Sequence, residues 1–108
     1  MAKAIIHAGI CGFTTQVITK IEDDVCTITL TSECQAINRL GEMLKEVNPY
    51  REISTRRGTP QTLEAGMKYC THAACPVPVG IIKAVEVAAG LALPADVTIT
   101  VSKEQDPG

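Results

Sequence analysis

The sequence predicts a single α+β domain, a two-layer sandwich in which helices cover one face of a mostly antiparallel four-stranded sheet. Three segments near the amino terminus alternate apolar and polar residues with the period of a strand. Later segments repeat apolar residues with the period of a helix packed on a sheet. The 108 residues suffice for one modest core. We expect the order β-β-β-α-α-α-β over residues 1–108, with residues 103–108 frayed.

The first three strands are expected over residues 3–10, 14–21 and 25–31. A glycine-flanked loop, Gly9-Ile10-Cys11-Gly12, separates the first two strands. The third segment has the clearest alternation, with apolar residues on one face and threonines on the other. This pattern places Cys26 on the apolar face, where free cysteines are commonly buried. We therefore expect Cys26 in the core.

Two helices are expected to follow the third strand. Ser32 and Gln35 have the spacing of a capping box, which predicts that the first helix begins at Ser32. The Asn48-Pro49 pair ends this helix. Thr59-Pro60 resembles an N-cap followed by proline in the first helical position, so a short second helix should run to about Tyr69.

A third helix and a last strand complete the expected fold. Pro78 suits the first turn of this helix, and Gly90 suits its carboxyl-terminal cap. Residues 96–102 alternate valine or isoleucine with threonine or serine, which predicts the fourth strand of the sheet. Residues 50–58 carry three arginines without periodicity, and we expect a solvated loop or a poorly specified strand there.

Composition excludes several classes of function. The net charge of −2 argues against nucleic acid as a partner, because phosphate binding requires a basic surface. No apolar run reaches the roughly 20 residues that span a membrane. The first residues lack the layout of a signal peptide. We therefore expect a cytoplasmic protein that binds neither nucleic acid nor membrane.

Four of the five cysteines lie at the ends of predicted elements. Cys11 follows the first strand, Cys34 begins a helix, Cys70 ends one, and Cys75 precedes another. In a reducing compartment these thiols are metal ligands, reactive groups or packing residues rather than disulfides. If the first and third strands run parallel or as a crossing pair, Cys11 and Cys34 can lie at one edge of the sheet, within reach of the turn from Cys70 to Cys75.

Four thiolates that converge at such an edge could hold an iron–sulfur cluster or a zinc ion. Zinc ribbons show two short cysteine knuckles, whereas this chain has one wide candidate, Cys70-x4-Cys75. The cysteine–proline pair at Cys75 occurs at the terminal ligand of bacterial ferredoxins. The favoured hypothesis is an iron–sulfur cluster on Cys11, Cys34, Cys70 and Cys75, used in electron transfer, sensing or structure. Structural zinc is the alternative.

Other functions stay open at this point. Cys34 at a helix start, where backbone amides stabilise a thiolate, could act with Cys75 in thiol redox or sulfur transfer. The threonine-rich face could serve a metal-free interaction module or a homodimer. A redox protein is a further possible partner. The chain has no hydrolase motif or phosphate-binding glycine loop, and whether it is an enzyme is left open.

Two stretches carry a family resemblance. Residues His7–Phe13 and Cys70–Pro78 resemble those of a small, uncharacterised cysteine-containing family of anaerobic prokaryotes. The resemblance extends over most of the chain. It implies no activity, but an anaerobic setting would suit an oxygen-sensitive cluster.

Overall fold

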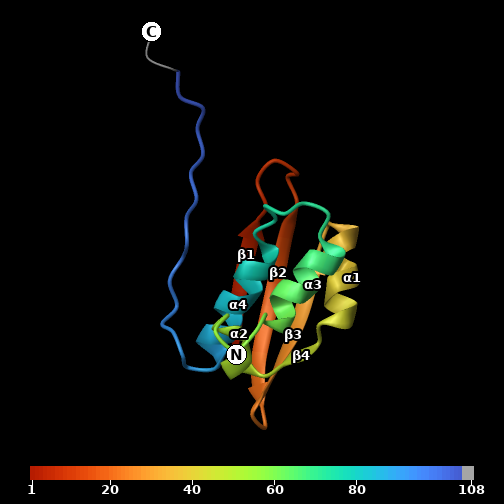
Figure 1. Cartoon of the computed structure of the whole chain (residues 1–108), viewed down its shortest axis with the longest axis vertical. Coiled ribbons are helices and arrows are strands. Elements are labelled where there is room, and N and C mark those ends of the chain that lie inside the picture. The colour runs from red at the N-terminus through yellow and green to blue at the C-terminus, as the bar shows by residue number, and fades with distance from the viewer. Residues whose placement is uncertain (106–108) are drawn as a thin grey trace.

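A computed structural model describes residues 1–105 of the chain. Their four strands form one antiparallel sheet in the order β1-β2-β3-β4, and α1 and α4 pack on one face of it (Figure 1). The α+β fold is thereby confirmed. The elements are β1 (Ala2–His7), β2 (Thr14–Glu22), β3 (Val25–Ser32), α1 (Gln35–Met43), β4 (Glu46–Val47), α2 (Pro49–Glu52), α3 (Gln61–Tyr69) and α4 (Val77–Ala88).

The register of the sheet brings two strand ends to the same place. β1 and β3 both run antiparallel to β2, so they share a direction. His7 pairs with Thr14, and Thr15 pairs with Ser32. The carboxyl ends of β1 and β3 therefore meet at one end of the sheet. The β1–β2 loop, which follows β1, and the start of α1, which follows β3, therefore both lie at this end of the sheet.

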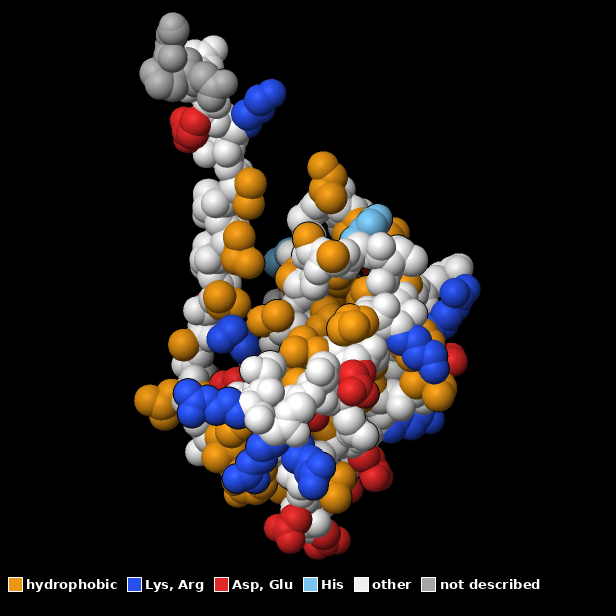
Figure 2. Space-filling model, viewed as in Figure 1, with side chains coloured by type: hydrophobic (Ala, Val, Ile, Leu, Met, Phe, Trp, Pro, Cys, Tyr) orange, Lys and Arg blue, Asp and Glu red, His pale blue; other side chains and the backbone are white. Residues whose placement is uncertain are grey.

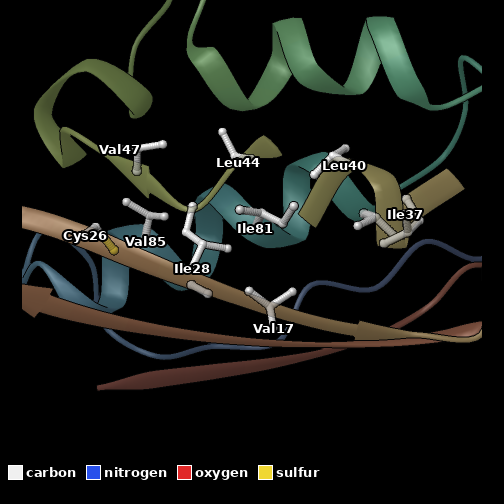
Figure 3. Packing of buried hydrophobic residues seen from close by; sticks show 11 residues of the cluster. Val17, Cys26, Ile28, Ile37, Leu40, Leu44, Val47, Ile81 and Val85 are labelled. Atoms are coloured by element: carbon white, nitrogen blue, oxygen red, sulfur yellow. The ribbon is translucent and has the colours of Figure 1, made fainter. Parts of the chain in front are cut away.

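The core is built from aliphatic side chains of the sheet and two helices. Val17, Ile28 and Cys26 face Leu40 of α1 and Ile81 of α4, and all five are buried (Figure 3). The prediction that Cys26 lies in the core is confirmed. Burial raises the pKa of its thiol, because an apolar environment disfavours the thiolate.

α3 forms an outer layer over α1 and α4 (Figure 1). Its close approach to α4 requires a glycine. A Cβ atom built on Gly66 would lie only 2.7 Å from Cγ of Pro78, a distance that real Cβ contacts do not reach. Gly66 therefore sets the spacing between the end of α3 and the start of α4.

A buried carboxylate begins α3. Glu52, at the end of α2, accepts hydrogen bonds from the backbone N–H of Gln61 at 3.1 Å and of Thr62 at 2.8 Å. It also accepts one from Oγ1 of Thr62 at 2.6 Å. The predicted cap at Thr59 is wrong, because Pro60 occupies the N-cap position of α3. Glu52, which lies outside the helix, accepts the hydrogen bonds of the free amides at the start of α3.

The first helix also differs from the prediction. α1 begins at Gln35 with Cys34 as its N-cap, because Ser32 continues β3 and pairs with Thr15. It ends at Met43. Val47 then pairs with Cys26, which makes the short strand β4 inside the segment expected to be helical. The expected loop over residues 50–58 contains most of the four-residue helix α2.

The predicted last strand does not form. Residues 96–102 have no secondary structure, and Val97, Ile99 and Val101 are 60%, 77% and 87% exposed. The observed order within residues 1–105 is therefore β-β-β-α-β-α-α-α. Alternation makes a segment able to form a strand, but the strand itself requires a hydrogen-bonded neighbour. The chain after α4, which we call the C-terminal segment (residues 91–105), instead turns back and runs beside the molecule, apart from the sheet (Figure 1).

Candidate functional site

A cavity of about 670 Å³ lies at the end of the sheet where β1 and β3 finish. Three segments line it: the β1–β2 loop, the start of α1 and the turn between α3 and α4. The β1–β2 loop and the α3–α4 turn are neighbours at the top of Figure 1. All four cysteines predicted as ligands, Cys11, Cys34, Cys70 and Cys75, are among its lining residues. We call this space the thiol cavity.

Cys34 is positioned by the end of β3. Its backbone N–H donates to Oγ of Ser32 at 3.0 Å, and Ser32 in turn shares a hydrogen bond of 2.8 Å with Oγ1 of Thr15. The side chain is half-buried and packs against the core. The adjacent Glu33 accepts from the N–H of Thr14 at 3.0 Å, which ties the β1–β2 hairpin to the start of α1.

Cys70 and Cys75 flank a tight turn. Cys70 is the C-cap of α3, and its N–H donates to the carbonyl of Gly66 at 2.9 Å. The N–H of Cys75 donates to the carbonyl of His72 at 3.2 Å. Cys75 is not helical, as expected of a residue before proline, and α4 starts two residues later. Both thiols are half-buried and pack against the core.

The environment of Cys70 disfavours its thiolate. Burial, followed by the charge of the neighbouring Cys75 and more weakly that of Cys34, raises the pKa of Cys70 to about 12. An apolar surrounding and nearby like charges both penalise an additional negative charge. Cys34, Cys70 and Cys75 thus form one interacting group of thiols.

Cys11 occupies a different environment. It is exposed, on a loop whose Gly9 and Gly12 both have positive φ values, 88° and 74°. The loop is closed by hydrogen bonds from Gly12 N–H to the Gly9 carbonyl at 2.9 Å and from Ala8 N–H to the Phe13 carbonyl at 3.1 Å. Cys11 therefore forms the outer wall of the thiol cavity, while the other three thiols form its inner wall.

The described thiols surround a space and do not meet at a point. Within residues 1–105, no group of three or more His, Cys, Asp and Glu side chains is placed to hold a metal ion. All five cysteines are free thiols. The expected gathering of Cys11, Cys34, Cys70 and Cys75 around one cavity is observed, whereas their role as ligands stays a prediction.

Other residues of the cavity wall were not predicted as ligands. Ile10, Phe13 and Ile37 contribute apolar surface, and His72 lies in the wall beside the two cysteines of the turn. The sequence signal for the first two is their position beside the glycines of the β1–β2 loop. His7, at the end of β1, is exposed, and its Nδ1 forms a 3.0 Å hydrogen bond with Oγ1 of Thr14.

Comparisons with known proteins bear on the family and not on the activity. Neither curated proteins nor solved structures gave a match to this chain. No helix described within residues 1–105 has the length and apolarity needed to cross a membrane. A family model described as a family of unknown function, DUF6951, matches residues 2–101, which confirms the resemblance to an uncharacterised family. Because this match spans nearly the whole chain, the protein belongs to the DUF6951 family.

Proposed function

We propose that the protein holds an iron–sulfur cluster in the thiol cavity, with Cys11, Cys34, Cys70 and Cys75 as ligands, for electron transfer, sensing or structure. The observation that carries the proposal is that thiols from three separate segments line one cavity of about 670 Å³. Cysteine thiolates are the usual ligands of such clusters. The fifth cysteine, Cys26, lies in the core and takes no part.

The electrostatics of the inner wall favour a cationic occupant. Burial and the neighbouring thiols hold the pKa of Cys70 well above its ordinary value. An iron cation that replaces the proton stabilises the thiolate, and it also reduces the repulsion between adjacent thiolates. α1 and α4 begin beside Cys34 and Cys75. The positive ends of these helices would stabilise the net negative charge of a cluster with thiolate ligands.

The spacing of the thiols favours a cluster over a single zinc ion. Zinc requires four sulfurs about 2.3 Å from one atom. The described residues offer no three ligands so arranged, although four thiols line the cavity. A cluster distributes its thiolates over two or more iron atoms, so they need not converge on one point. Cys11 would complete the ligand set from the glycine-hinged loop.

The test is the metal content of protein purified without oxygen. We expect a brown solution that absorbs visible light and contains iron and acid-labile sulfide. Cys70→Ser and Cys75→Ser should each lose most of the iron, while Cys26→Ala should retain it because that thiol lies in the core. Bound zinc without colour would select a single-ion site, and metal-free protein would contradict both forms of the proposal.

A dithiol redox function is the second candidate, favoured by the proximity of Cys70 to Cys75. The sequence suggested Cys34 and Cys75 as the reacting pair. In the structure, the charge of Cys75 raises the pKa of Cys70 more than the charge of Cys34 does, which favours Cys70 and Cys75 as the pair. Oxidation would join the sulfurs of Cys70 and Cys75 in a disulfide and pass two electrons and two protons to a partner's disulfide, which becomes a dithiol. Mass spectrometry of metal-free protein after exposure to oxidised glutathione, with Cys70→Ser as control, would detect this bond.

A further inference from the structure

We propose that residues 96–102 add as a strand to the free edge of β1 in a second copy of the chain. Each copy would then give its segment to the other, forming a strand-exchanged dimer. This inference is independent of the thiol cavity. It rests on an unpaired sheet edge, an unpaired segment with the pattern of a strand, and the way the chain leaves α4.

The unpaired edge is β1. Within the described sheet β1 pairs with β2 alone, so the N–H and C=O groups that point away from β2 have no strand partner. At the opposite edge, β4 pairs with Cys26 and Thr27 of β3 and α1 packs against β3, whereas the outer side of β1 is unpaired over its six residues. A long unpaired edge is a template for another strand, and proteins normally cover it. Nothing in residues 1–105 pairs with this one.

The unpaired segment has the composition of a strand and follows an extended course. Val97, Ile99 and Val101 alternate with Thr98 and Thr100, residue types that favour strands. The segment is extended, and Figure 2 shows apolar side chains spaced along it and left uncovered. The family match ends at residue 101, the last apolar position of the alternation. The pattern is therefore part of the region that defines the family.

The two faces of such a strand suit the two sides of β1. On the helix-covered side, α4 approaches β1 so closely that a Cβ atom on Gly80 would clash with Ile6. The apolar face of the added strand would extend this side and cover the flank of α4. On the open side, its threonines would continue a surface on which Thr29 and Thr31 of β3 are exposed.

The exit from α4 favours a second copy as the occupant. Gly90 has a φ of 72°, and its N–H donates to the carbonyl of Val87 at 3.1 Å. The N–H of Leu91 donates to the carbonyl of Glu86 at 2.9 Å. These two bonds form a Schellman motif, which fixes the direction in which the chain leaves the helix. The chain then turns and runs beside its own molecule without pairing with its own β1, so the apolar side chains of the segment stay uncovered there. The molecule extends 59 Å against 28 and 25 Å in the other directions (Figure 1).

A two-fold dimer pairs both the free edge of β1 and residues 96–102 of each copy. Two copies present two edges and two segments, so a symmetric exchange leaves neither β1 edge unpaired. The exchange also buries the exposed Val97, Ile99 and Val101 of both chains. The open, threonine-rich face of the sheet is not needed for this dimer.

The experiment compares the mass of three full-length proteins by sedimentation equilibrium. The wild type is expected to be a dimer. Val97→Asp/Ile99→Asp places charges on the apolar face of the segment and should halve the mass to that of a monomer. Thr98→Asp/Thr100→Asp adds the same charge to the open face and should remain dimeric. These positions lie outside the core, and circular dichroism checks that all three proteins fold.

Amide hydrogen exchange completes the test. In the wild type, residues 97–101 and the outward amides of β1 should be protected, and both sets should lose protection in the Val97→Asp/Ile99→Asp variant. A monomeric wild type would overturn the proposal, whether the segment is free or docked on its own β1. A Val97→Asp/Ile99→Asp variant that remains dimeric would also overturn the proposal, since another surface would then hold the copies together.

Discussion

The two ends of α3 place chemically different groups against the same helix. At its amino end, the buried carboxylate of Glu52 accepts three hydrogen bonds from Gln61 and Thr62. At its carboxyl end, the thiol of Cys70 is half-buried beside Cys75, and its pKa is raised to about 12 by burial and by neighbouring thiols. At the amino end, the buried carboxylate is fully hydrogen-bonded. At the carboxyl end, the neighbouring thiols would repel one another as thiolates.

This difference separates a stabilising site from the proposed binding site. A satisfied buried carboxylate contributes to folding and has nothing left to bind. We expect the clustered thiols to contribute less to folding than Glu52 does, whereas a metal or an oxidant would change their charge.

The largest expected effect is at the amino end of α3. Glu52→Ala leaves the N–H groups of Gln61 and Thr62 and a buried hydroxyl without their acceptor, so we expect a loss of about 3–5 kcal/mol in the free energy of unfolding. Urea denaturation measures it. Glu52→Gln keeps one acceptor oxygen and should lose clearly less. Equal losses in the two variants would show that the carboxylate is not the capping group.

The next effect is expected in the middle of the helix, where Gly66 meets Pro78. Gly66→Ala inserts a Cβ atom 2.7 Å from Cγ of the proline ring, so overpacking should cost about 1–3 kcal/mol despite the better helix propensity of alanine. Thermal unfolding of the metal-free protein measures this cost. Pro78→Ala removes Cγ, and in that background the cost of Gly66→Ala should shrink. A strictly additive double variant would argue against the contact.

At the carboxyl end of α3, removal of a thiol should barely change the stability of the metal-free protein. Cys75→Ser preserves size and polarity, so we expect a change below about 1 kcal/mol in the free energy of unfolding. The same substitution should abolish most iron binding. Chemical denaturation and iron analysis of the Cys75→Ser variant distinguish a role in folding from a role in iron binding. A large loss of stability without metal would place Cys75 among the structural residues.

The smallest effect at neutral pH is the titration of Cys70. Because the pKa of this thiol rises from 9.0 to about 12 on folding, the folded metal-free protein holds the proton more tightly than the unfolded chain. The resulting stabilisation is complete below pH 9 and is lost as the pH rises from 9 toward 12. Urea denaturation across this range should show a decline that Cys70→Ala reduces. Cys26, whose pKa burial also raises, adds a decline in the same direction.

Sequence reasoning located the thiol cavity because strand direction decides where strand ends lie. β1 and β3 flank β2, so the residues that follow them, including Cys11 and Cys34, emerge at one end of the sheet. The turn from Cys70 to Cys75 reaches this end between α3 and α4. The unequal burial of the four thiols was not predictable, because it depends on how the helices pack.

Local pattern misplaced the elements that depend on distant partners. The capping box at Ser32 was wrong because Ser32 pairs with Thr15 and extends β3. The cap of α3 was missed because Glu52 lies nine residues before Gln61 in the chain. No nearby sequence signal connects these residues.

The amino-acid sequence alone determined the alternation of the first three strands, the burial of Cys26 and the positions of the four thiols at the ends of elements. These features follow from periodicities within short segments. Only the tertiary structure decided which segment became the fourth strand: Val47 pairs with Cys26, whereas residues 96–102 pair with no strand within residues 1–105. A strand exists through hydrogen bonds to another strand, and the sequence of one segment does not specify that partner.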